Sequence, residues 1–285
     1  MKKEIEKKIE EILKKIKENS FMKIENEEKF KKYLRDALEK NIPITFFNWE
    51  CPTRFLDKTS DGRIFVNYDL DLEKIFNLEK YDDFTEFPRC VDEFQREKNI
   101  FEFLNSLKIP YRFVKLIADT NALYLNKESL KILGEEKVYQ KFNEFKERVF
   151  EQVKKYPLDN FSVELFTEKF QDKMSFYNEV FQENYKKLKN KEKIDLLDKK
   201  FVELQKERTR KHMGMDDEKM IEDFTYRTIA SYGAEGVIFS LFEKSNIFSN
   251  PVWLNIEEAN ERTKAITNFS RLKNGEEKLP MVFLK

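Results

Sequence analysis

In 115-KLIADTNALYL-125, an apolar run stops at Asp119-Thr120-Asn121 and a second apolar run follows at once. The preceding segment, 111-YRFVKLIA-118, begins after Pro110 and predicts a strand. The three polar residues then stand at an ordinary strand-to-loop corner, where short polar side chains hydrogen-bond their own backbone, or at the carboxyl end of a buried strand, where α/β proteins bind ligands. The second possibility would make this stretch part of a functional site.

The segments before this strand alternate between predicted helices and predicted strands. The stretch 42-IPITFFNWECP-52 has β-favouring residues, no helical period and a stop at Pro52, which indicates a buried strand. The other elements expected here are a helix over 26–40, a strand over 63–68 after the Asp61-Gly62 turn signal, and a helix over about 91–107. This alternation favours an α/β fold, a Rossmann-like and mostly parallel sheet with helices on both faces.

The middle of the chain, residues 127–213, has a different character. It is rich in Lys, Glu and Phe at helical spacing, with few breakers, and includes 161-FSVELFTEKFQDKMSFYNEVFQENYKKLK-189. We expect a helical insertion or cap of three or four helices here, between the two parts of an α/β core formed by residues 1–126 and 214–285.

The last part of the chain predicts a long helix over 216–244 that begins at Asp216 or Asp217. Gly233 and Gly236 lie inside it and each costs about 1 kcal/mol relative to Ala, so a kink or a close backbone approach is expected there. The remaining expected elements are an amphipathic helix over 1–18, which packs on the main body or pairs with a partner, and strands over 252–256 and 281–284.

Composition and charge exclude several classes of function. Lys+Arg and Asp+Glu are equal at 54 each, which disfavours nucleic-acid binding through bulk charge. Two cysteines make no disulfide framework and favour a cytoplasmic protein, and neither a signal peptide nor a membrane span is evident. One histidine and no Cys cluster argue against a zinc site. GxGxxG and GxxxxGK[ST] are both absent, so no nucleotide cofactor is expected.

Polar residues follow three of the predicted strands, where an α/β sheet would bring them to one edge. The three groups are Asn48 to Arg54, Asp119 to Asn121, and Asn255 to Glu258 with Asn260, Arg262, Thr263 and Lys264. Asp119 or Glu257 would act on a substrate ammonium as counter-ion or proton acceptor, and Arg54 and Arg262 would bind a phosphate or carboxylate. Asn121, Thr120, Asn255 and Lys264 complete the candidate substrate-binding set.

The long helix 216–244 carries a second group of candidates, because Tyr226, Arg227, Tyr232 and Glu235 are polar members of a largely apolar element. Arg227 and Glu235 are eight residues apart, about two turns, and are expected to share a face. They would line a pocket, with Glu235 as a further catalytic candidate, or form an internal salt bridge or surface positions.

The order of these segments resembles that of the isonitrile synthases, which are grouped with the pyoverdine and dityrosine biosynthesis proteins. The stretches that carry the resemblance are 43-PITFFNWECPTRF-55, 116-LIADTNALYL-125, 226-YRTIASYGAEGVIFSLF-242, 252-VWLNI-256 and 281-MVFL-284. The resemblance implies an enzyme that joins the amino group of tyrosine or tryptophan to a carbon of a sugar phosphate, with Asp119 at the ammonium and Arg54 or Arg262 at the phosphate or carboxylate. This chain departs from the pattern after the late strand, where Asn255-Ile256-Glu257-Glu258 replaces a Ser-Ile-His-Pro-like stretch.

The sequence therefore predicts a cytoplasmic transferase or synthase, without a cofactor, that acts on a small amino-acid-like or phosphorylated substrate such as an amino acid or a sugar phosphate. Two alternatives stay open. The first is a binding module for RNA or protein that uses the helical insertion, in which 205-QKERTRKHMG-214 is basic. The second is a relative that retained the fold and lost the chemistry. A helix-mediated partner or a homo-oligomer is compatible with each of these.

Overall fold

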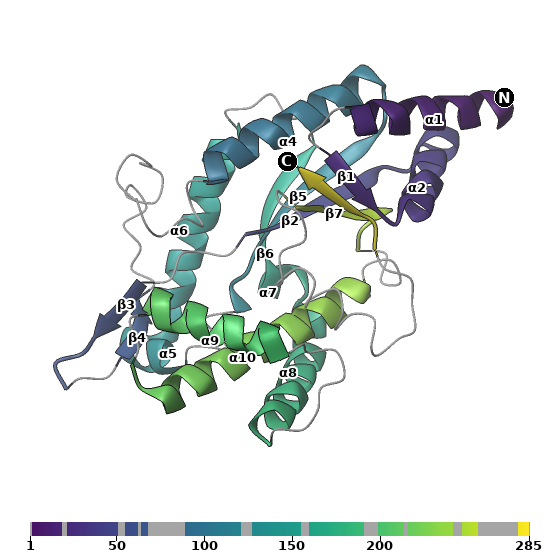
Figure 1. Cartoon of the computed structure of the whole chain (residues 1–285). Coiled ribbons are helices and arrows are strands. Elements are labelled where there is room, and N and C mark those ends of the chain that lie inside the picture. Colours follow the sequence, from purple (N-terminus) through teal and green to yellow (C-terminus); the bar gives the residue numbers. More distant parts are fainter. Residues whose placement is uncertain are drawn as a thin grey trace.

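A computed structural model of the chain describes residues 2–18, 22–50, 55–61, 64–67, 89–120, 127–154, 160–190, 199–213, 216–241, 247–255 and 279–284. A six-stranded sheet with the order β1-β8-β7-β2-β5-β6 lies at its centre (Figure 1). Its strands are β1 (Met22–Glu25), β2 (Ile44–Glu50), β5 (Tyr111–Ile117), β6 (Phe161–Leu165), β7 (Pro251–Asn255) and β8 (Met281–Leu284). The pairs β8–β7, β7–β2, β2–β5 and β5–β6 are parallel, and β1 is antiparallel to β8. The predicted α/β, Rossmann-like fold with a mostly parallel sheet is confirmed.

Helices cover both faces of this sheet (Figure 1). The first face packs on α1 (Lys2–Glu18), α2 (Glu27–Lys40), α4 (Arg89–Ser106), α5 (Lys127–Leu133) and α6 (Glu135–Lys154). The second face packs on α7 (Phe166–Lys169), α8 (Met174–Lys189), α9 (Lys199–Met213) and α10 (Glu218–Ser240), with the 3₁₀ turn η3 (Gln171–Lys173) between α7 and α8. We call these the α4 face and the α10 face.

Alternation along β2 divides its side chains between the two faces, as a pleated strand requires. Ile44 and Phe46 belong to the hydrophobic cluster of the α4 face, and Phe47 belongs to that of the α10 face. Because β2 has parallel neighbours on both sides, it has no open edge, and its side chains are buried from Ile44 to Asn48. The core is therefore two apolar layers separated by one sheet.

The segment predicted to be wholly helical contains a strand, which corrects that part of the sequence interpretation. Phe161–Leu165 forms β6 and pairs in parallel with β5, so residues 127–213 contribute an edge strand to the main sheet as well as α5, α6, α7, α8 and α9. The five residues FSVEL alternate apolar and polar side chains, but this short period-2 signal stands beside long helical patterns that dominate a wider window.

Two other strands differ from expectation or were not anticipated. β1, between the first two helices, lacked a sequence signal, because four residues are too few to show a period. The predicted strand near 63–68 exists as β4 (Ile64–Asn67), but it pairs antiparallel with β3 (Phe55–Lys58) in a separate two-stranded sheet and lies outside the main one.

The N-cap of α10 is Asp217, whose Oδ1 accepts from the backbone N–H groups of Lys219 and Met220.

A charged pair is buried on the α4 face, within the carboxyl halves of β2 and β5. The Nζ of Lys115 donates to Oε1 of Glu97 at 3.1 Å, and the Nδ2 of Asn48 donates to the same oxygen at 2.8 Å. Lys115 and Glu97 are both 0% exposed, and the Lys115 ammonium also lies 5.6 Å from the centroid of the Phe113 ring. These bonds connect helix α4 to the adjacent strands β2 and β5, and they include a buried ion pair between Lys115 and Glu97.

Lys115→Met is expected to lower the free energy of unfolding by about 3–5 kcal/mol, because it removes one partner of a buried ion pair and leaves the Glu97 carboxylate without the Lys115 ammonium. The double variant Lys115→Met/Glu97→Leu should recover much of this loss, since the second charge is then removed as well. Urea unfolding of the two proteins and of Glu97→Leu gives the coupling free energy of the pair.

Arg112→Met provides a matched control in the same strand. Arg112 pairs with Glu164 at 3.1 Å, but its side chain is 43% exposed. A pair at that exposure is worth about 1 kcal/mol or less, so the control should lose much less stability than Lys115→Met. Equal losses for Lys115→Met and Arg112→Met would contradict the special cost assigned to the buried charge.

Candidate active site at the carboxyl edge of the sheet

The stretch that follows β5 is buried on the α10 face of the sheet edge. Asp119 is 1% exposed and Thr120 is 0% exposed. These two polar residues after the strand are therefore buried and do not form an exposed surface loop. Oδ1 of Asp119 accepts from the backbone N–H of Thr167 at 3.0 Å, and Oδ2 accepts a short hydrogen bond from the Thr167 hydroxyl. Because Thr167 is in the first turn of α7, Asp119 joins the carboxyl end of β5 to the start of that helix.

Burial raises the pKa of the Asp119 carboxyl from 3.8 to about 6, although the hydrogen bonds from Thr167 lower it. The folded protein therefore holds this proton more tightly than the unfolded chain does. By proton linkage, the contribution of Asp119 to the free energy of unfolding falls as the pH rises from about 4 to about 6. Above about pH 6 this contribution no longer changes with pH.

Asp119→Asn should accordingly gain stability relative to the wild-type protein as the pH rises from 4 to 7. The difference between about 6 and the ordinary pKa of 3.8 corresponds to roughly 3 kcal/mol. The asparagine keeps a carbonyl that accepts from the Thr167 N–H and carries no charge at any pH. Urea unfolding of both proteins at a series of pH values measures the trend, and a constant difference between them from pH 4 to pH 7 would show that Asp119 is not a buried titrating acid.

A second buried carboxylate, Glu235 of α10, is connected to the same strand end. The hydroxyl of Thr120 donates to Oε1 of Glu235 at 3.3 Å, and the hydroxyl of Ser231 donates to the same oxygen at 3.1 Å. The Ser231 hydroxyl also lies 2.7 Å from the hydroxyl of Tyr177 in α8. Glu235 is 1% exposed, so this hydroxyl–carboxylate chain is enclosed between β5, α8 and α10.

An aromatic group adjoins these polar residues at the end of β2. The ring of Trp49 makes edge contacts with Phe166 (centroids 4.9 Å apart) and with Phe239 (5.1 Å). Phe166 directly precedes Thr167, the partner of Asp119, and Phe239 lies one helical turn beyond Glu235. The Trp49 ring thus contacts a residue adjacent to the hydrogen-bond partner of Asp119 and a residue one turn from Glu235.

Tyr226 and Arg227, two further candidates on α10, bond acidic residues of the same helix and do not contact the carboxyl end of β5 in any bond described for them. The hydroxyl of Tyr226 donates to Glu222 at 2.8 Å, and burial together with this bond raises the pKa of Tyr226 to about 12. The Nε of Arg227 donates to Asp223 at 2.7 Å, and its guanidinium lies 5.3 Å from the Tyr185 ring. Eight residues at 3.6 per turn leave about 80° between Arg227 and Glu235, which explains why the first is part-exposed and the second is buried.

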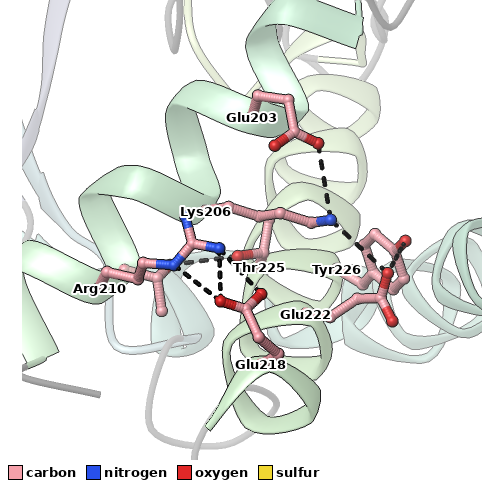
Figure 2. A network of polar contacts seen from close by, with 8 residues as sticks. Glu203, Lys206, Arg210, Glu218, Glu222, Thr225 and Tyr226 are labelled. Atoms are coloured by element: carbon pink, nitrogen blue, oxygen red, sulfur yellow. Dashed lines mark hydrogen bonds and ion pairs between the residues drawn. The ribbon is translucent and has the colours of Figure 1, made fainter. Parts of the chain in front are cut away.

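Figure 2 shows that Tyr226 belongs to a polar network between α9 and α10. Lys206 pairs with Glu203 and Glu222, each at 3.6 Å, and Arg210 makes bidentate contacts with Glu218 at 2.6 and 2.8 Å. The basic run 205–214 predicted as a possible RNA contact therefore has these two cations paired with carboxylates. The side chains of Arg208, Lys211 and His212 lie outside the described residues.

Several predicted site residues cannot be placed at this edge. Arg54, Asn121, Glu257, Arg262 and Lys264 lie outside the described residues, as does the side chain of Asn255. The backbone of Asn255 ends β7 opposite Phe283 of β8. Of the predicted residues, the structure thus brings Asp119, Thr120 and Glu235 to one edge of the sheet, and the convergence of the arginines on this edge stays a prediction.

Sequence reasoning did not identify three participants, Thr167, Tyr177 and Ser231. Thr167 follows an unrecognised strand, so its position at a helix start was not apparent. Ser231 had a usable signal, because it precedes Glu235 by four residues and so lies on the same face of a helix that was predicted correctly. Tyr177 stands in a helix rich in aromatic residues and has no local feature that separates it from its neighbours.

Comparisons with known proteins add no assignment of individual residues. No family model matches the sequence, and no curated protein matches it significantly. Among solved structures, the chain resembles a CDPS from Fluoribacter dumoffii with a TM-score of 0.48 at 8% identity, over 93% of this chain and 97% of the other. It also resembles Leishmania major tyrosyl-tRNA synthetase in complex with tyrosinol (TM-score 0.42, 12% identity, 99% of this chain) and a tryptophanyl-tRNA synthetase homolog from Entamoeba histolytica (0.41, 12%, 93%).

This chain spans 30% and 52% of the length of those two synthetases. At such identities the likeness extends to the α/β architecture alone. Within the described residues, no helix has the length and apolar character needed to cross a membrane, and no group of three or more His, Cys, Asp or Glu side chains is arranged to hold a metal ion.

Proposed function

We propose that the chain is a transferase or synthase that acts on a small molecule bearing an ammonium group, such as an amino acid, at the carboxyl edge of the sheet. The observation that carries this proposal is the position of Glu235, a carboxylate buried beside the carboxyl end of a central parallel strand. Ligands of open α/β sheets bind outside this end of the strands. A carboxylate there is suited to bind an ammonium group and to accept its proton.

The surrounding groups support a polar, cation-accepting site over one built for phosphate. Asp119 places a second buried carboxylate at the same edge, and hydroxyls of Thr120, Ser231 and Tyr177 form the chain to Glu235. Hydroxyls both donate and accept, so Thr120 and Ser231 can redirect their hydrogen bonds when a substrate proton is taken up by Glu235. Both carboxylate oxygens of Asp119 accept from Thr167, whereas the donors to Glu235 are hydroxyls that can rearrange, so we assign the contact with the substrate to Glu235.

The segments that resemble the isonitrile synthases support the same substrate class. They contain β2, β8, most of β7 and of α10, and the last two residues of β5, and so include parts of the centre of the sheet and the part of the helix that carries Glu235. In that family the reacting group is the amino group of an amino acid. We propose the same group as the substrate nucleophile here, with Glu235 in the place where Asp119 was first expected to act.

Glu235→Gln tests the proposal, because the amide retains a carbonyl for the Thr120 and Ser231 hydroxyls and loses the charge and basicity of the carboxylate. The wild-type protein should be stabilised by at least one member of a panel that contains the twenty common amino acids and phenethylamine. At a concentration of 100 times the Kd, a ligand adds about 2.7 kcal/mol, which raises the melting temperature by roughly 5 °C. Glu235→Gln should lose this shift.

The matched control is Glu222→Gln, the same substitution on the same helix at a side chain that bonds Tyr226 (Figure 2). It should respond to the panel like the wild-type protein. An unchanged response in Glu235→Gln, or no stabilisation of the wild-type protein by any amine in the panel, would overturn the proposed function.

A further inference from the structure

The indole N–H of Trp49 has no hydrogen-bond partner, although its nitrogen is buried. Leaving a buried donor unsatisfied costs about 1–3 kcal/mol, and the large majority of buried polar side-chain atoms in native proteins are paired. Trp49 as a whole is part-exposed, and it lies near the end of β2. A donor in this setting is available to a group that enters from outside.

The location separates Trp49 from the other buried donors that lack a hydrogen-bond partner among the described residues. Gln205 and Thr228 also have unpaired buried atoms, but they belong to the helices α9 and α10, and Asn250 precedes β7 at the amino end of that strand. Trp49 stands at the carboxyl end of β2, the central strand, where a ligand of this fold is expected.

A ring contact and the strand register place the indole near the proposed substrate position. Phe239, which touches the Trp49 ring, is one helical turn from Glu235, and residues at that spacing have Cβ atoms about 5–6 Å apart. Trp49 also lies in the strand next to β5, opposite Leu116 in the β2–β5 register, and Thr120 follows four residues after Leu116. An indole donor and the Glu235 carboxylate therefore flank the same stretch of the sheet edge.

We propose that the Trp49 indole N–H binds a carboxylate or carbonyl oxygen of the same small molecule whose ammonium group meets Glu235. Indole nitrogen only donates and carboxylate only accepts, so the two groups complement the two polar ends of an α-amino acid head. The site then selects α-amino acids and their carbonyl derivatives over simple amines. This inference rests on the proposed function, and it assigns Trp49 as the residue that distinguishes the two ligand classes.

Trp49→Phe tests the inference, because phenylalanine retains a ring against Phe166 and Phe239 and lacks the donor. The probes are L-phenylalanine, whose ring suits these aromatic neighbours, and phenethylamine, which has the same ring and amine and no carboxylate. A hydrogen bond to a charged group predicts that Trp49→Phe binds L-phenylalanine about 10- to 100-fold more weakly by titration calorimetry. Its affinity for phenethylamine should stay within about twofold of the wild-type value, since that probe has no oxygen for the indole.

Trp253→Phe is the matched control and also a reporter. The chain has two tryptophans, so this variant leaves Trp49 as its single indole, and it should bind both probes like the wild-type protein. Its fluorescence should change when L-phenylalanine is added and much less when phenethylamine is added. Circular dichroism and urea unfolding establish that both variants are folded.

The outcomes separate this inference from the function on which it rests. If phenethylamine binds the wild-type protein and loses affinity in Glu235→Gln, but Trp49→Phe binds L-phenylalanine as tightly as the wild type, the role of Trp49 is refuted and the proposed function stands. If neither probe binds the wild-type protein, this inference fails, whereas the proposed function fails only if no amine of the whole panel stabilises the protein.

Discussion

Parallel pairing of β2 with β5 on one side and β7 on the other is the constraint on which the rest of the structure depends. Parallel neighbours cannot be joined by a tight hairpin, so each pair needs a crossover that places helices on the faces of the sheet. α4 lies between β2 and β5 in the chain, and α5 and α6 lie between β5 and β6. Parallel order also brings the carboxyl ends of these strands to one edge, where Trp49 and Asp119 are found. Fold and candidate site are thus consequences of the same pairing.

The site depends equally on a helix that arrives late in the sequence. Thr120 and Glu235 are 115 residues apart, and their contact connects the end of β5 to α10. α10 is buried from Thr228 to Phe239, and within this part Ser231 bonds Tyr177 of α8 and Glu235 bonds Thr120 after β5. The buried glycines Gly233 and Gly236 lie within this part of the helix. This arrangement requires the correct rotation of α10 as well as its presence.

The sequence was sufficient for elements with strong local signals. Apolar runs predicted β2 and β5, and periodicity with an aspartate cap predicted α10, whereas β6 was wrongly taken as helix because five alternating residues were outweighed by helical neighbours. For the site, a polar interruption after an apolar strand located Asp119 and Thr120, and an isolated acid in an apolar helix located Glu235. The sequence could not predict which of these side chains touch. Local periodicity gives the buried face of α10, but it does not determine how that helix is rotated about its axis relative to the end of β5, which lies 115 residues away in the chain.

The two faces of the sheet contain buried acids with different hydrogen-bond donors, and the difference bears on the proposed function. On the α4 face, Glu97 is joined to the Lys115 ammonium, so the charges are balanced inside the fold and the group fixes the position of β5 against α4. On the α10 face, Glu235 accepts hydrogen bonds from the hydroxyls of Thr120 and Ser231. An internally paired charge has little to offer a substrate, since disrupting the pair is costly. Hydroxyl donors can rearrange at low cost, which is why we place the proposed site on the α10 face.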